Sequence, residues 1–210
     1  MADSKVTALS AIASVAGEDL IYIVDDPAGT PTSKKATVTQ LATFLGTGGA
    51  TAPLYFFPAS NEPPSSNFAT LDMRSNGHPV LDFDDTTAEA AIFTGVLMPG
   101  YASGGITVKV AYSTTSAITG TAGWTIEIER IGDSQLDVDG DSFASAQTIT
   151  AVTVPGTTGF VDVVSVNISD GANMDSVAAG EQFRIRIKRD TATDTAAGDT
   201  EFHWMSVEEQ

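Results

Sequence analysis

The chain has 210 residues, of which 42% are hydrophobic and 18% charged, a globular composition with room for one substantial core plus an appendage. Ten Lys and Arg against 27 Asp and Glu give a formal net charge of -17, which opposes binding to nucleic acid or to an anionic membrane surface. The absence of cysteine excludes disulfides, thiolate catalysis and cysteine-based metal sites. Ser, Thr, Gly and acids interrupt the first twenty residues, so we expect neither a signal peptide nor a membrane span there.

The first part of the chain, residues 1–57, is predicted to be a small arm that contains one strand and one short helix. The apolar run Leu20–Val24 predicts the strand, and the Asp, Pro and Gly residues that follow it predict a turn. Thr39 precedes a short amphipathic stretch that ends at Gly46, which indicates a capped helix of one or two turns. The Pro- and Ser-rich stretch 58–66 is predicted to be a joint to the next domain.

Charge separates this arm from the remainder. Residues 1–60 carry three basic and five acidic side chains, a net charge of -2, whereas residues 61–210 carry seven against 22, a net charge of -15. One strand and a short helix cannot bury a core alone, so the arm is expected to dock on the second part of the chain, on a copy of itself or on a larger assembly. The predicted partner-binding residues are Leu20, Tyr22, Ile23, Val24, Leu54, Tyr55, Phe56 and Phe57. The alternative is that the aromatic residues of the stretch 54–57 pack under the main domain.

Residues 67–210 are predicted to form an all-β, jelly-roll-like antiparallel β-sandwich. Apolar and polar residues alternate in several runs, and Gly or Pro turns separate many of them, as is typical of a sandwich. The eight predicted strands are 80–83, 91–98, 106–112, 124–129, 148–154, 161–168, 183–188 and 202–207.

The sequences of two of these strands allow more detailed predictions. In the run 161–168 the valines change parity midway, which indicates either a β-bulge or burial on both faces. In the run 183–188 the polar positions are Arg184, Arg186 and Lys188, which could lie opposite Glu127 and Glu129 in a cross-strand charge ladder.

The acidic stretch LDVDGDSF, residues 136–143, has Asp at alternate positions, as calcium-binding loops do, but it does not match the EF-hand pattern. A loop that starts at Asp137 needs Gly at its sixth position and Glu at its twelfth, and these positions hold Ser142 and Thr148. We therefore predict a turn stabilised by Asp, with no metal and no cofactor. The alternative is a looser calcium site on this loop.

Catalytic motifs are also lacking in the sequence. His78 and His203 are isolated, and there is no nucleophile elbow, P-loop or dinucleotide fingerprint, so no enzymatic activity is predicted. A jelly roll can bind carbohydrate through exposed aromatic residues. Four candidates for this role are Trp124, Trp204, Tyr101 and Tyr112, although Trp124 is expected in the core because it begins an apolar strand face.

The arm resembles a short module found near the N-termini of tailed-bacteriophage virion proteins. The resemblance is carried by KVTALSAIASVAGEDLIYIVDDPAGTPTSKKATVTQLATFL at residues 5–45. The stretch that begins LDFDDTTAEAAIFTGVLMPGY, followed by GWTIEIERI and DSFASAQTIT, resembles a β-sandwich domain that recurs in phage structural proteins.

The resemblance implies a virion location and a capsid decoration or cement protein, which would dock through its arm on the major capsid protein or on a tail or neck protein. It also implies a homo-oligomer, most simply a trimer. The alternative is a short tail or tail-fibre component or an adhesin that binds glycan. A glycan-processing enzyme is a third hypothesis, which the missing catalytic set disfavours.

Overall fold

A computed structural model describes residues 16, 18–25, 29, 32–41, 52–133 and 137–210. The chain forms two compact units, residues 1–50 and 51–210, which are considered separately below. Among the described residues, no helix is both long and apolar enough to span a membrane.

The first unit contains a β-hairpin followed by the start of a helix. Strand β1 (Leu20–Asp25) pairs antiparallel with β2 (Thr32–Thr37), so that Leu20 lies opposite Thr37. The sequence predicted β1 but not β2, because β2 is made of Thr, Ser, Lys and Ala and lacks an apolar face. Residues 38–41 are helical.

The cap of this helix is Thr37 and not the predicted Thr39. The hydroxyl of Thr37 accepts a bond from the amide of Gln40 at 3.0 Å, and the side chain of Gln40 accepts one from the amide of Thr37 at 2.8 Å. This reciprocal pair is a capping box, which satisfies two backbone donors at the helix start. The predicted end of the helix at residues 42–46 lies outside the described residues.

The second unit contains ten strands among its described residues, and all eight predicted strands are confirmed. These eight are β5 (Pro79–Phe83), β6 (Ala90–Val96), β7 (Ile106–Thr114), β8 (Thr121–Ile131), β9 (Gln147–Thr153), β10 (Asp162–Ile168), β11 (Gln182–Arg189) and β12 (Thr200–Glu209). The two that were not predicted are β3 (Leu54–Phe56) and β4 (Thr70–Met73). Both are too short to show the alternation that marks a strand in a sequence.

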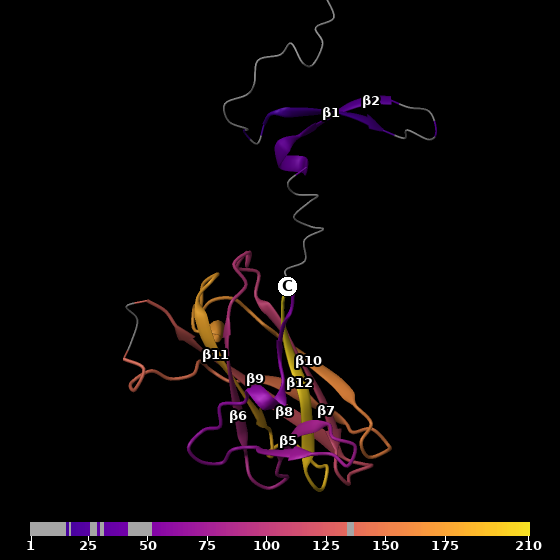
Figure 1. Ribbon diagram of the computed structural model, residues 1–210, viewed down its shortest axis with the longest axis vertical. Helices are drawn as coiled ribbons and strands as arrows, with labels where there is room; N and C mark the ends of the chain where they lie inside the picture. Colours follow the sequence, from indigo (N-terminus) through magenta and orange to yellow (C-terminus); the bar gives the residue numbers. More distant parts are fainter. Residues whose placement is uncertain (1–15, 17, 26–28, 30–31, 42–51, 134–136) are drawn as a thin grey trace, which may run out of the picture. The chain divides into compact units, whose positions relative to one another are not determined.

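These strands form two antiparallel sheets that pack face to face, which confirms an all-β sandwich of jelly-roll type (Figure 1). The larger sheet has the order β10-β7-β12-β5-β4, and β3 pairs with β12 beside β5. The smaller sheet has the order β6-β11-β8-β9. Trp124, Phe83 and Tyr112 are fully buried between the sheets, and the Trp124 ring packs edge-on against both of the others.

Residues 54–57 belong to the sandwich, which places the division between the two units earlier than the predicted arm boundary at residue 57. Strand β3 pairs with β12, and Phe56 is buried between the sheets against Phe93 and Phe183. Gly95 makes room for this ring, because a Cβ at that position would approach Phe56 Cζ to 2.9 Å. Phe56 is thus a core residue whose neighbours lie far away in the sequence.

The predicted charge ladder is confirmed on the outer face of the smaller sheet. Arg184 lies opposite Glu129 and Arg186 opposite Glu127, with Arg184 Nη1 2.7 Å from the Glu129 carboxylate. Lys188 also pairs with Glu127, at 2.8 Å. Both glutamates are buried, so these pairs satisfy charges that would otherwise be costly.

The predicted bulge or two-sided burial in residues 161–168 is wrong. Strand β10 pairs with β7 in an unbroken register, so there is no bulge. Val164 and Ile168 are buried, whereas Val161 and Val163 are 52% and 50% exposed. The parity change therefore marks apolar side chains on the outer face of the larger sheet.

Candidate functional site

The outer face of the larger sheet carries exposed apolar rings at a β-bulge in strand β12. Phe202 and Met205 both point into the core although they are three residues apart, and the register with β7 shifts between Phe202 and Trp204. His203 and Trp204 therefore occupy the outer face side by side, where regular alternation would place one residue. A bulge of this kind redirects side chains and often adjoins a functional site.

Three aromatic rings meet at this point, and we call them the aromatic stripe: Tyr55, Phe57 and Trp204. The centroid of the Tyr55 ring lies 6.3 Å from that of Phe57, with the rings nearly parallel, and 6.0 Å from that of Trp204, with the rings tilted. Tyr55 and Phe57 are 53% and 54% exposed, and Trp204 is partly exposed. Val163 continues this apolar surface across β7, because it pairs with Ala111, which pairs with Trp204.

A cluster of polar groups occupies the strand positions on one side of the stripe. The carboxylate of Glu201 pairs with the guanidinium of Arg74 and accepts a hydrogen bond from the Ser113 hydroxyl at 2.6 Å. His203 Nε2 lies 2.9 Å from that hydroxyl oxygen. Because the Ser113 proton already goes to Glu201, His203 Nε2 is the donor in this contact. Burial and the nearby Arg74 lower the pKa of His203, which favours the neutral ring.

Asp82 extends this polar cluster onto strand β5, where it lies directly opposite Glu201. Burial, with the nearby Asp72 as a second cause, raises the pKa of Asp82 from 3.8 to about 6. Its Oδ1 atom is buried and has no hydrogen-bond partner among the described residues. An unsatisfied buried acceptor of this kind is uncommon in folded proteins.

The other side of the stripe carries a second pair of charges. Lys109 Nζ lies 2.8 and 2.7 Å from the two carboxylate oxygens of Glu208, and the Ser206 hydroxyl donates to the same carboxylate at 3.1 Å. The ion pair lowers the pKa of Glu208. The stripe is thus flanked on both sides by groups that hydrogen-bond, on strands that the core holds in place.

The contact between Ser113 and His203 does not form a catalytic triad. In a triad the serine hydroxyl gives its proton to the histidine, and an acid holds the opposite ring nitrogen. Here the Ser113 hydroxyl is fully buried and donates to Glu201. The arrangement is suited to holding the polar cluster rigid.

The structure separates the predicted partner-binding residues. Tyr55 and Phe57 are exposed, whereas Phe56 is buried and Leu54 is partly buried and packs against the core. In the first unit, Leu20 is 59% exposed, whereas the side chains of Tyr22, Ile23 and Val24 lie outside the description. A partner-binding role for the β1 residues and the trimeric state both stay predictions.

Of the four aromatic candidates for carbohydrate binding, the structure leaves only Trp204 available. Trp124 and Tyr112 are fully buried, as expected for Trp124. Tyr101 is also buried, and its hydroxyl donates to Asp170 at 2.6 Å and accepts from the Gly105 amide at 3.0 Å. Burial raises the pKa of Tyr101 to about 12, which fits a structural hydrogen bond.

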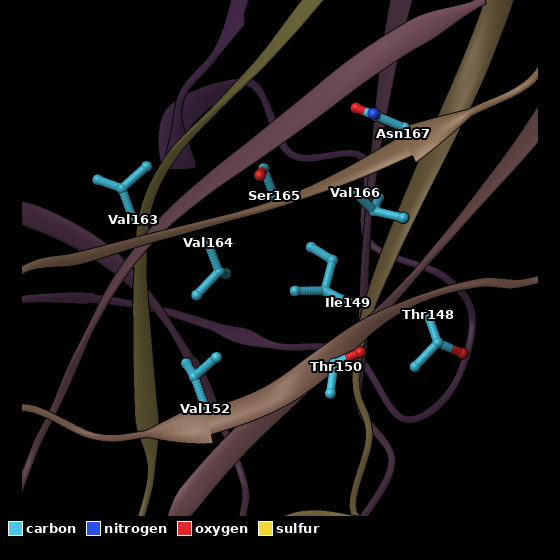
Figure 2. Close-up of a pocket in the computed structure, with 9 residues that line it drawn as sticks. All are labelled: Thr148, Ile149, Thr150, Val152, Val163, Val164, Ser165, Val166 and Asn167. Carbon is cyan, nitrogen blue, oxygen red and sulfur yellow. The ribbon is translucent and has the colours of Figure 1, made fainter.

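A second candidate is a groove of about 500 Å³ between β9 and β10, the edge strands of the two sheets (Figure 2). Ile149 and Val164 point toward each other across it. Its nine lining residues are Thr148, Ile149, Thr150, Val152, Val163, Val164, Ser165, Val166 and Asn167. These supply hydroxyl, amide and aliphatic groups but neither an aromatic ring nor a charge, so the groove offers little to orient a ligand.

The acidic stretch at 137–143 forms a turn. The Asp137 carboxylate accepts a bond from the Asp139 amide at 3.1 Å, and the Asp137 carbonyl accepts one from Gly140. The described residues contain no group of three or more acidic or histidine side chains arranged to hold a metal ion. Phe143, just beyond the turn, lies over the Arg186 guanidinium at 4.1 Å, on the smaller sheet.

The polar cluster of Arg74, Asp82, Ser113 and Glu201 was not predicted from the sequence, in which His203 looks isolated. These residues lie on β5, β7 and β12 and just after β4, and the order of these strands in the sheet cannot be read from the chain. One feature of the sequence does indicate the bulge. Phe202 has an even residue number, whereas the apolar Met205 and Val207 have odd ones, so a regular strand could not point all three side chains into the core.

Comparisons with known proteins gave structural similarities only. No protein-family model matches the chain, and no curated protein matches it. A C-terminal family 6 carbohydrate-binding module of a marine laminarinase from Zobellia galactanivorans is 15% identical, with a TM-score of 0.44, over 75% of this chain and 100% of that one. A xylan-binding module of family 15 is 10% identical, with a TM-score of 0.46, over 76% and 97%.

A further solved structure is an exo-β-1,3-galactanase from Phanerochaete chrysosporium, 13% identical with a TM-score of 0.45, of which this chain covers 36%. None of these structures is a phage protein, and no family model connects the chain to phage proteins. The predicted relationship to tailed-bacteriophage virion proteins is therefore wrong, and so is the predicted function as a capsid decoration or cement protein. Short strand-and-turn patterns recur in unrelated β proteins, which explains how the resemblance arose.

Proposed function

We propose that residues 51–210 form a glycan-binding module whose ligand lies on the aromatic stripe. The observation that carries this proposal is the exposed arrangement of Tyr55, Phe57 and Trp204 between two hydrogen-bonding clusters on a rigid sheet. Its support is this surface, because structural similarities with TM-scores below 0.5 do not establish a shared function.

The chemistry of a sugar ring matches this surface. A pyranose presents C–H groups on its faces and hydroxyl groups around its edge, so it can stack on an aromatic ring while its hydroxyls bond to polar groups beside the ring. Trp204 and Tyr55 offer the rings. Glu208 and Asp82, which are partly exposed, offer acceptors on the two sides of the stripe.

The binding face needs little reorganisation to receive a ligand. Trp204 sits at a bulge whose neighbours Phe202 and Met205 are fully buried, and Tyr55 is held by the pairing of β3 with β12. Side chains fixed in this way lose little conformational entropy on binding. The same rigidity makes the effect of a point substitution on binding easy to separate from an effect on folding.

Removal of Trp204 should weaken binding strongly. If a sugar ring covers about 80 Å² of the indole, the apolar contact contributes about 2 kcal/mol at about 25 cal/mol per Å². That energy corresponds to a loss of about 30-fold in affinity. Tyr55→Ala should give a loss of similar size.

The test is titration calorimetry of the full chain against soluble neutral polysaccharides of several backbone types. Phe143→Ala is the matched control, because Phe143 is a partly exposed aromatic residue on the smaller sheet, where it contacts Arg186. We expect Trp204→Ala and Tyr55→Ala to weaken binding and Phe143→Ala to leave it unchanged. Equal losses in all three variants, or binding to none of the polysaccharides, would overturn the proposal.

A further inference from the structure

We infer that the glycan bound by the aromatic stripe is electrically neutral. This inference rests on the proposed function and restricts the ligand to one class of glycan. The first observation is that every basic side chain of residues 51–210 is already committed to a carboxylate. The seven pairs are Arg74–Glu201, Lys109–Glu208, Arg130–Glu181, Arg184–Glu129, Arg186–Glu127, Lys188–Glu127 and Arg189–Asp194.

The two cations next to the stripe are each engaged by a carboxylate, and Arg74 is held more tightly than Lys109. Arg74 also donates to the Ser113 hydroxyl at 3.3 Å, and the side chain of its partner Glu201 is only 8% exposed. Drawing Arg74 toward a ligand would leave the Glu201 carboxylate buried and unpaired, which is costly. Lys109 bonds both oxygens of Glu208 and so has less freedom to turn to an anionic ligand.

The surrounding charge also disfavours an anion. Residues 61–210 carry seven basic and 22 acidic side chains, a net charge of -15, and residues 51–60 carry no charged side chain. Asp72 and Asp82 lie on the same sheet as the stripe and add to this charge. A uronate, a sulfate or a phosphate on the ligand would meet a repulsive field with no cation free to offset it.

A cationic ligand fits less well than a neutral one, because the charged groups flanking the stripe already neutralise each other in pairs. Glu201 and Glu208 are each paired with a basic side chain of the protein. The Oδ1 atom of Asp82 is buried, so an ammonium group would have to lose its hydration to approach it. The hydroxyl groups of a neutral sugar can donate to the partly exposed carboxylate of Glu208 without bringing a charge.

The test compares one set of backbones in three charge states. Soluble glucans, xylan, mannan and galactan are each prepared in neutral, carboxymethylated and aminoethylated form, and the full chain is titrated with each at 20 and 500 mM NaCl. We expect the neutral form of the bound backbone to bind at least tenfold more tightly than its carboxymethylated form. Its affinity should change less than twofold with salt, since no ion pair forms with the ligand.

The other results decide between the inference and the proposed function. Tightest binding of a carboxymethylated or an aminoethylated form, lost in Trp204→Ala, would overturn the inference and leave glycan binding at the stripe intact. Binding of any form that survives Trp204→Ala and Tyr55→Ala would overturn both, as would a complete lack of binding.

A pair of variants tests the role of the paired cation itself. Glu208→Gln removes one negative charge and releases Lys109 beside the stripe, whereas Asp139→Asn removes the same charge from an exposed turn that is not part of the larger sheet. We expect a two- to fivefold gain for carboxymethylated ligand in Glu208→Gln only, the size typical of one exposed ion pair. Equal gains in both variants would show that net charge alone excludes anions and would overturn this assignment to the paired lysine.

Discussion

The pair of Arg189 and Asp194 should be the most sensitive electrostatic contact in the sandwich. The two side chains are 0% and 2% exposed. Besides Asp194, the Arg189 guanidinium donates to three backbone carbonyls, of Phe83 at 3.0 Å and of Gly198 and Ala196 at 2.8 Å each. It thereby joins the end of β11 to β5 and to the loop that leads into β12.

Replacing Arg189 by Met keeps most of the side-chain volume but removes the charge. The Asp194 carboxylate then stays buried without a cation, and three carbonyls lose a donor. Breaking a buried pair in this way costs about 3–5 kcal/mol. For a domain of this size each kcal/mol lowers the melting temperature by about 2–4 °C, so we expect a drop of about 6–20 °C.

The assay is thermal unfolding followed by near-ultraviolet circular dichroism, since both tryptophans lie in the sandwich and Trp124 is in its core. The control is the double variant Arg189→Met/Asp194→Asn, in which the uncompensated charge is gone while an acceptor for the Ala196 amide is retained. It should be more stable than Arg189→Met alone. A loss below about 1 kcal/mol in the single variant, or a less stable double variant, would refute the reasoning.

Three further changes test other parts of the sandwich. Asp82→Asn should raise the free energy of unfolding above pH 6 and leave it unchanged below pH 3.8, because the raised pKa of Asp82 means that its ionised form destabilises the folded state. Urea unfolding at pH 3.5 and pH 8 measures this difference, and equal effects at the two pH values would contradict the prediction. Gly105→Ala should cost about 1–3 kcal/mol, since Gly105 has φ +92, and an unchanged melting temperature would be the opposing result. A fragment of residues 51–210 should be clearly more stable than a fragment of residues 66–210, because the shorter fragment lacks β3 and the buried Phe56. Limited proteolysis measures the difference, and equal resistance of the two fragments would argue against a structural role for β3.

The sequence predicted the strands well where the alternation ran over several residues. Strands β7, β8 and β11 each show one apolar face, and the ladder of Arg184 and Arg186 against Glu129 and Glu127 followed from the polar faces alone. In such runs the core imposes a period of two on the side chains, and this period is visible without knowledge of the neighbours.

The candidate site could not be predicted in the same way, because it depends on which strands are neighbours. Trp204 and Tyr55 are about 150 positions apart and meet only because β3 pairs with β12. The same holds for Arg74 and Glu201, which come from opposite ends of the sandwich sequence. Tyr55 shows a further limit: its neighbour Phe56 is also aromatic and yet lies in the core, since adjacent residues of a strand point to opposite faces.

The central claim is that a neutral glycan lies on Trp204, and nuclear magnetic resonance of the two indole N–H groups tests it most directly. The chain has two tryptophans, one on the outer face and one in the core. During titration with a neutral oligosaccharide of the backbone bound most tightly, the Trp204 indole signal should shift progressively while that of Trp124 stays in place. Binding with no shift at Trp204, and with shifts confined to the amides of β9 and β10, would contradict the claim and move the site to the groove between those strands.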